Sequence, residues 1–171
     1  HNNIATFYAR NEVFRNLGFD SFTSIEYMHP TEFTPLNWSK DIVLKDEIMK
    51  ALQSTEETDY LYCISVQGHG SYPTEKILDN PKINVSGLED ESRLNQFEYY
   101  VNQINEMDDF IGQLVDELSN FNEDTVLVIY GDHLPSLAID EAEIKNGNLY
   151  QTEYVIWSNF KCYFRSNFYF C

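Results

Sequence analysis

Three side chains that can bind a metal ion or a phosphate follow two apolar runs of the sequence. Asp132 and His133 follow the run at residues 125–130 after a single glycine, and His69 comes shortly after the run at residues 60–66. A carboxylate oxygen and a neutral imidazole nitrogen are both good ligands for a divalent metal ion. Asp132 and His133 therefore indicate a metal site. The alternative is that Asp132 caps a helix and His133 is an ordinary loop histidine, because such short motifs often arise by chance.

The elements around these residues predict how they are positioned. Both apolar runs are typical of strands buried on both faces, and Gly131 allows the chain to turn sharply where the second run ends. Between the runs, apolar residues recur every three or four positions over residues 92–118, which predicts a long amphipathic helix. Strand, helix and strand would form a right-handed crossover with parallel strands. His69 and the 132–133 pair would then share one edge of the sheet, where α/β proteins bind ligands.

The remaining segments predict shorter elements. We expect helices at residues 11–17 and 41–54, a short strand at residues 154–157, and loops at residues 26–37 and 71–90. Gly18 is well placed to end the first helix. Cys63 lies within an apolar run and is expected to be a small buried residue. No two cysteines have the CxxC spacing of a zinc ribbon or redox motif.

Composition limits the possible partners. The 171 residues are 43% hydrophobic, which is typical of a globular domain, and carry a formal net charge of -17. This charge argues against a nucleic-acid partner or an anionic membrane surface, because both require a basic face. No apolar run approaches the about 18 residues that a membrane-spanning helix needs, so we expect none within this sequence.

Three blocks resemble the lipoteichoic acid synthase branch of the sulfatase and alkaline-phosphatase superfamily. They are FYARNEVFRNLGFDSF at residues 7–22, QGHGSYP at residues 67–73, and VIYGDHLPSL followed by YQTEYVIWSNF. The resemblance covers residues 1–160 in the family's order and leaves residues 161–171 as an unassigned tail. It implies an α/β fold, an alkaline-phosphatase/sulfatase-like sheet flanked by helices, of which this chain would be a partial domain.

The resemblance also implies an activity. Members of this branch are bacterial enzymes anchored in the cell membrane, with the catalytic domain on the extracellular face. They transfer phosphoglycerol from phosphatidylglycerol to a glycolipid or teichoic acid acceptor, using a divalent metal, usually Mn²⁺ or Mg²⁺. By this resemblance, residues 1–160 are the C-terminal portion of the catalytic domain. The membrane anchor, the nucleophile and a further acidic metal ligand would belong to the N-terminal half.

Site residues follow from the resemblance one by one. Asp132 and His133 match the family's metal ligands, and His69 matches a histidine that contacts the phosphate. The residues that hold the glycerol phosphate match His1, Tyr8 and Arg10. The sequence departs from the family's pattern at two places, with Ala9 where the family usually has asparagine and Ser71 where it has proline.

Several alternatives remain open at the level of sequence. Within the superfamily the protein could be a sulfatase or a phosphoethanolamine transferase, and outside it a non-catalytic remnant that keeps the fold. Two ligands do not complete a catalytic metal site, which needs at least a third. Among the substrate residues, Tyr8 could be core, His1 could be frayed, and Arg10 could form a surface ion pair with Glu12 or Asp20.

Overall fold

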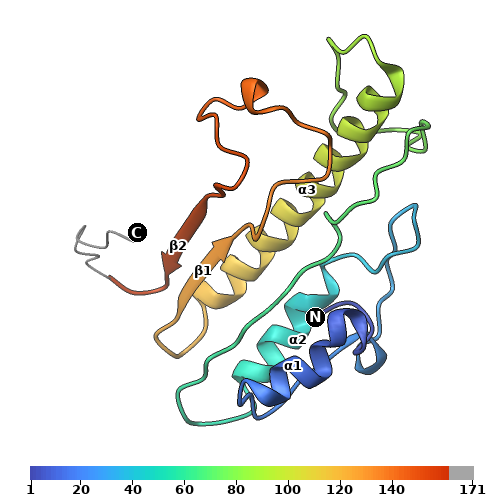
Figure 1. The fold of residues 1–171 in the computed structure, drawn as a ribbon. Helices are drawn as coiled ribbons and strands as arrows, with labels where there is room; N and C mark the ends of the chain where they lie inside the picture. The colour runs from blue at the N-terminus through green and yellow to red at the C-terminus, as the bar shows by residue number, and fades with distance from the viewer. Residues whose placement is uncertain (162–171) are drawn as a thin grey trace. The chain divides into compact units, whose positions relative to one another are not determined.

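The computed structural model describes residues 1–161, which divide into two compact units (Figure 1). The predicted tail falls almost entirely outside the described residues, as do Cys162 and Cys171. The first unit spans His1–Ile111 and the second begins at Gly112, within the longest helix. In chain order the elements are η1 (Phe7–Ala9), α1 (Arg10–Asn16), η2 (Ile25–Tyr27), α2 (Val43–Leu52), α3 (Glu91–Ser119), β1 (Val126–Tyr130), η3 (Glu141–Glu143) and β2 (Tyr154–Ser158).

The helices confirm the predictions made from the periodicity of the sequence. The expected helices at residues 11–17, 41–54 and 92–118 are α1, α2 and α3, each within a few residues of its expected bounds. Gly18 follows α1 with a φ of 87°, a conformation that glycine adopts without steric cost. Residues 71–90 contain no helix or strand, as expected. The buried apolar side chains of this unit are mostly helical and include Phe14, Leu44, Ile48, Met49, Tyr99 and Phe110.

A buried polar network joins the segments that carry His1 and His69. The side chain of Asp41 is fully buried, and its Oδ1 accepts hydrogen bonds from Asn2 Nδ2 at 2.7 Å and from the main-chain nitrogens of Val66 and Gln67, both at 3.2 Å. Gln67 in turn donates to Gln103 of α3 at 3.1 Å. A buried carboxylate is tolerated where several donors compensate its charge. Asp41 thus ties the first residues of the chain to the residues just before His69, and Gln67 ties these to α3.

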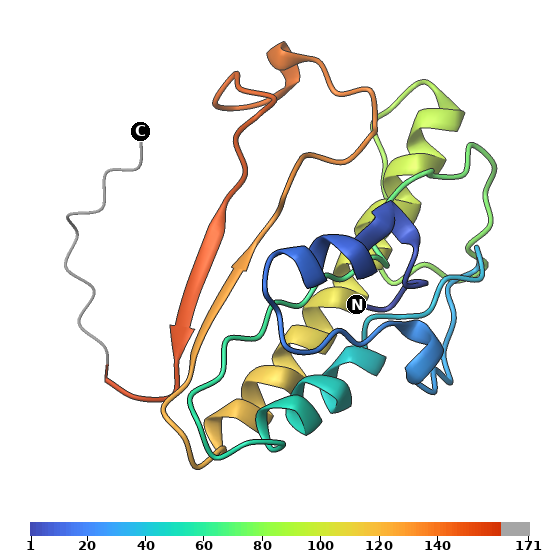
Figure 2. The same ribbon diagram turned by 60° about the horizontal axis from the view of Figure 1, so that its bottom comes forward.

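The prediction of a buried strand at residues 60–66 is wrong. These residues have no strand assignment, and the ribbon runs as coil after α2 (Figure 2). Only Val66 among them is buried, and Cys63, expected to be buried, is exposed. Apolar and β-branched residues express a preference for a sheet, but a strand also needs a hydrogen-bonding neighbour. No described segment pairs with this one, so the predicted parallel crossover is not formed.

The second unit is built on an antiparallel pair of strands. β1 pairs with β2 from Val126↔Ser158 to Tyr130↔Tyr154, which confirms the short strand expected at residues 154–157. Asn159 closes the end of the pair, because its Oδ1 accepts from the Thr125 main-chain nitrogen at 2.8 Å. Exposure alternates along β1, and every second side chain is open to solvent. The prediction that β1 is buried on both faces is therefore wrong within this unit.

Helices and a small sheet make this an α/β chain, in agreement with the predicted fold class. Among the described residues, no helix combines the length and the apolar character that crossing a bilayer requires.

The buried carboxyl of Asp41 predicts a pH dependence of stability. Burial raises its pKa from the ordinary value of 3.8, and the hydrogen bonds it accepts only partly offset this. When the pKa of a carboxyl is higher in the folded protein than in the unfolded chain, the group stabilises the fold fully at pH values below its unfolded-state pKa. This contribution is lost as the pH rises through the folded-state pKa. Asp41→Asn keeps an accepting oxygen but cannot ionise. We expect the variant to gain stability relative to the parent as pH rises from about 4, as measured by urea unfolding over a pH series.

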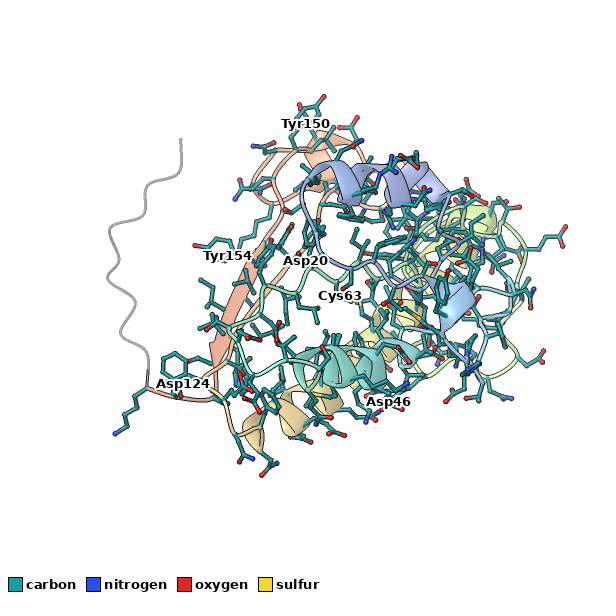
Figure 3. The ribbon with its side chains drawn as sticks, turned by 90° about the horizontal axis from the view of Figure 1, so that it is seen from below. Asp20, Asp46, Cys63, Asp124, Tyr150 and Tyr154 are labelled. Carbon is teal, nitrogen blue, oxygen red and sulfur yellow. The ribbon has the colours of Figure 1, made fainter. Side chains whose placement is uncertain are left out.

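The matched control is Asp46→Asn, at an exposed position of α2, the helix that begins two residues after Asp41 (Figure 3). It removes one carboxyl from the surface and so shows how stability responds to the loss of charge alone. A difference between Asp41→Asn and the parent that does not change with pH would show that Asp41 ionises equally easily in the folded and unfolded states.

Candidate functional site

Arg10 is placed by an unusual turn of the backbone. Tyr8 and Ala9 both have positive φ, 53° and 52°, directly before α1 begins at Arg10. After this turn the guanidinium carbon of Arg10 lies 5.5 Å from the ring centroid of Phe7 and 5.7 Å from that of Tyr8. Asparagine enters this left-handed region more readily than alanine. This preference gives a physical reason for the asparagine that the resemblance expects at position 9.

His1 lies beside Arg10 and is neutral in this contact. Nη1 of Arg10 is 2.8 Å from Nδ1 of His1. Because a guanidinium can only donate, Nδ1 must accept, and the imidazole hydrogen is then on Nε2. The ring also stacks on Phe22, with the two centroids 5.6 Å apart. His1 is only 8% exposed, so the alternative in which the first residue is frayed is wrong.

The ring of Tyr8 lies at the surface of the first unit. Tyr8 is 69% exposed, so the possibility that it belongs to the core is wrong. Glu12, one of the possible ion-pair partners of Arg10, forms its salt bridge with Arg15. An exposed tyrosine ring beside a guanidinium is a suitable surface for a small polar ligand.

His69 lies among aromatic rings of the same unit. Its ring stacks on Trp38 with centroids 5.9 Å apart and an interplanar angle of 13°, and meets the edge of Phe7 at 6.4 Å. Nδ1 of His69 is 2.6 Å from the carbonyl oxygen of Gly70, so Nδ1 carries a hydrogen and donates it. Phe7 contacts both His69 and the Arg10 guanidinium, and thereby links the two. We call Phe7, Tyr8, Arg10, Trp38 and His69, together with His1, the cradle.

Sequence reasoning missed Trp38. The segment at residues 26–37 was expected to be loop, but its end forms a tight turn in which Asn37 has a φ of 62° and the Thr34 nitrogen donates to the Trp38 carbonyl at 2.8 Å. The order Thr-Pro-Leu-Asn is a recognisable turn signal, since proline favours the second position of a turn and asparagine tolerates positive φ. That signal predicts the turn, although it does not predict which ring the following tryptophan meets.

Asp132 and His133 follow β1 in the second unit. Oδ1 of Asp132 lies 3.8 Å from Nε2 of His133, and both side chains are exposed. Nδ1 of His133 lies 2.7 Å from the carbonyl oxygen of Leu134 and donates its hydrogen to that oxygen. Nε2 then carries a lone pair and is the ring atom that can bind a metal ion. One ion can bind both atoms at about 2.1 Å each, because they lie less than twice that distance apart. The pair therefore fits a shared divalent metal.

The alternative in which Asp132 caps a helix is wrong. No helix begins there, and the capping box of this unit belongs to Asp140 at the start of η3. Across the described residues, no group of three His, Cys, Asp or Glu side chains is arranged to hold a metal ion. A metal ion at Asp132 and His133 would therefore need further ligands to complete its coordination shell, and the metal role of this pair stays a prediction.

The structure brings His1, Tyr8, Arg10 and His69 together in the first unit, and places Asp132 and His133 side by side in the second. The residues of the cradle come from segments far apart in the sequence. The common edge for His69 and the metal pair stays a prediction.

Comparisons with known proteins identify the family and the fold of this chain. The Sulfatase family model matches residues 1–162. A putative cyclic beta-1,2-glucan modification protein from Rhizobium meliloti (strain 1021) is 30% identical over 131 residues, which are 77% of this chain and 20% of that protein. Among solved structures, Streptococcus pyogenes phosphoglycerol transferase GacH in complex with sn-glycerol-1-phosphate superposes with a TM-score of 0.71 at 24% identity, covering 93% of this chain and 42% of GacH.

The chain thus spans about a fifth of the curated relative and less than half of the solved one. The structural match shows the fold, and the family match extends over nearly the whole sequence, including all six predicted site residues. The chain belongs to the sulfatase family.

Proposed function

We propose that this chain is part of a metal-dependent transferase of the cell surface that moves phosphoglycerol from phosphatidylglycerol to a glycolipid or polymer acceptor. The observation that carries the proposal is the cradle, in which a guanidinium contacts an exposed tyrosine ring and one imidazole, and the ring of Phe7 links it to a second imidazole. This combination suits a small phosphate ester with a polar carbon skeleton. GacH, a fold neighbour, is a phosphoglycerol transferase in complex with sn-glycerol-1-phosphate, which supports the same ligand class here.

Each residue of the cradle has a chemical part in this proposal. The guanidinium of Arg10 can hold two phosphate oxygens at once, which orients the phosphorus as well as neutralising charge. The exposed ring of Tyr8 packs against the glycerol carbons. His69 keeps Nδ1 on the Gly70 carbonyl, and its Nε2 donates to a phosphate oxygen when the ring is protonated.

Asp132 and His133 would hold the metal ion, with Mn²⁺ or Mg²⁺ as the proposed identity. When bound, such an ion neutralises charge on the phosphoryl oxygens. We further propose that residues 1–160 are the C-terminal portion of the catalytic domain, and that another part of the enzyme supplies the nucleophile and the third metal ligand. A membrane anchor and an extracellular location on a bacterial cell complete the proposal.

The acceptor is proposed to be a glycan-containing molecule. The curated relative is a putative cyclic beta-1,2-glucan modification protein, which supports a carbohydrate acceptor as well as a glycolipid or a teichoic acid.

The function is tested by supplying the full-length gene product with a fluorescent phosphatidylglycerol. We expect release of fluorescent diacylglycerol that stops when the metal is chelated, since the developing phosphoryl charge is then not neutralised. Phosphatidylethanolamine and an aryl sulfate are tested in parallel. Preferential turnover of either one would replace the proposal with a phosphoethanolamine transferase or a sulfatase. Absence of turnover on all three, with the cradle still binding sn-glycerol 1-phosphate, would favour a non-catalytic binding protein.

A further inference from the structure

The ring of His69 is held from two sides by aromatic residues. Trp38 covers one face in a nearly parallel stack, with an interplanar angle of 13°. Phe7 meets His69 at an interplanar angle of 82° and Trp38 at 87°, so it lies edge-on to both rings. Aromatic pairs in these two geometries attract each other beyond the effect of burial alone. Together with the hydrogen bond from Nδ1 to Gly70, these contacts leave the imidazole one preferred orientation.

Trp38 is itself held by the backbone and independently of any ligand. Its nitrogen donates to Thr34 Oγ1 at 3.1 Å, and its carbonyl accepts from the Thr34 nitrogen at 2.8 Å. A single bridge between Phe33 and Ser39 closes the same small hairpin. Two residues further on, the buried Asp41 binds the nitrogens of Val66 and Gln67, which precede His69. The hairpin and the His69 segment are thus joined at a buried carboxylate as well as through the stacked rings.

We propose that Trp38 is the positioning residue of His69: its indole fixes the imidazole plane so that Nε2 is presented to the phosphate of the ligand. This inference rests on the proposed function, because it assigns the phosphate to the cradle. A ring that is oriented before the ligand arrives does not have to be ordered on binding, so the hydrogen bond to phosphate forms at a smaller entropic cost. Trp38 itself needs no contact with the ligand in this role.

The first test measures the contact between the two rings. The chain has two tryptophans, so Trp157→Phe leaves Trp38 as the only indole reporter. A protonated imidazole stacked on an indole quenches its fluorescence. We expect the emission of Trp38 to fall on acidification, and His69→Gln to abolish this fall. His29→Gln is the matched control and should leave the fall intact.

The second test measures binding of sn-glycerol 1-phosphate to the 171-residue chain by calorimetry. Trp38→Leu keeps an apolar side chain but removes the aromatic face, and we expect it to weaken binding by about two- to tenfold. Trp38→Phe retains a ring and should recover most of the affinity. If Trp38 only filled space, a ring would not be needed, and Trp38→Phe would bind no more tightly than Trp38→Leu. Trp157→Leu, in β2, should bind as the parent does.

The outcomes separate this inference from the proposed function. A pH-dependent fall that persists in His69→Gln, or equal affinity of Trp38→Leu and the parent, would overturn the positioning role. If the parent does not bind sn-glycerol 1-phosphate at all, the proposed function fails, and the positioning of His69 for a phosphate fails with it even where the fluorescence confirms the stack. If the parent binds and both tests behave as expected, Trp38 is established as the positioning residue.

Discussion

Arg10→Lys should lower the turnover of phosphatidylglycerol by the full-length enzyme about ten- to a hundredfold, although the positive charge is kept. A guanidinium grips two phosphate oxygens in a fixed plane, whereas an ammonium is a single point charge. The loss of one charge-assisted hydrogen bond is worth about 1.5–3 kcal/mol, which corresponds to this range of rates. Lysine would also lose the planar contacts that Arg10 makes with the rings of Phe7 and Tyr8, at 5.5 Å and 5.7 Å.

The matched control for this prediction is Arg15→Lys. Arg15 lies on the same helix α1, is exposed, and pairs with Glu12 on the surface. Its replacement should change turnover little, because exposed ion pairs contribute little. Steady-state kinetics on a fluorescent phosphatidylglycerol measure both variants. Unchanged kinetics for Arg10→Lys would remove Arg10 from the substrate site.

Asp132→Ala should abolish the binding of Mn²⁺ to this chain and lower the turnover of the full-length enzyme by at least about a hundredfold. The expectation follows from the 3.8 Å separation of Asp132 Oδ1 and His133 Nε2, which suits one shared ion. Replacing a residue that only supports a metal ligand already costs about ten- to a hundredfold, and a direct ligand should cost at least as much. Since only two donors meet among the described residues, we expect Mn²⁺ to bind this chain weakly in titration calorimetry.

Asp124→Ala is the control for the loss of one negative charge away from the proposed metal site. Asp124 is an exposed acid between α3 and β1 (Figure 3), and its removal lowers the negative charge by the same amount. Its variant should bind Mn²⁺ as the parent does. Tight binding by the parent chain that survives Asp132→Ala would place the metal at other residues and would contradict the assignment.

Local patterns in the sequence determined the helices of this protein and the type of its candidate chemistry. The amphipathic period over residues 92–118 predicts α3 correctly, because the spacing of side chains along a helix depends only on neighbours a few residues away. The turn ended by Gly18 is local in the same sense, since it depends on the steric freedom of one residue. The choice of Asp132 and His133 as candidate metal ligands also follows from chemistry that each side chain carries by itself.

Strand pairing could not be derived in this way. Residues 60–66 have the composition of a buried strand, yet they have no paired neighbour in the described chain, whereas β1 pairs antiparallel with β2. Whether a segment becomes a strand depends on which other backbone lies alongside it, at any distance in the sequence. The same dependence explains why β1 was expected to be buried on both faces and is half open in this unit.

The cradle shows most clearly which features follow from the sequence and which depend on the tertiary structure. The sequence by itself determined that a histidine, a tyrosine and an arginine stand near the start of the chain and that another histidine follows the run at residues 60–66. Only the tertiary structure decided that Trp38 stacks on His69, that Phe7 joins them to Arg10, and that Asp41 ties the segments together. Apart from the contact of Phe7 with Arg10, these contacts join residues at least 25 positions apart in the sequence. They exist because buried polar groups and aromatic faces must each find a partner when the chain becomes compact.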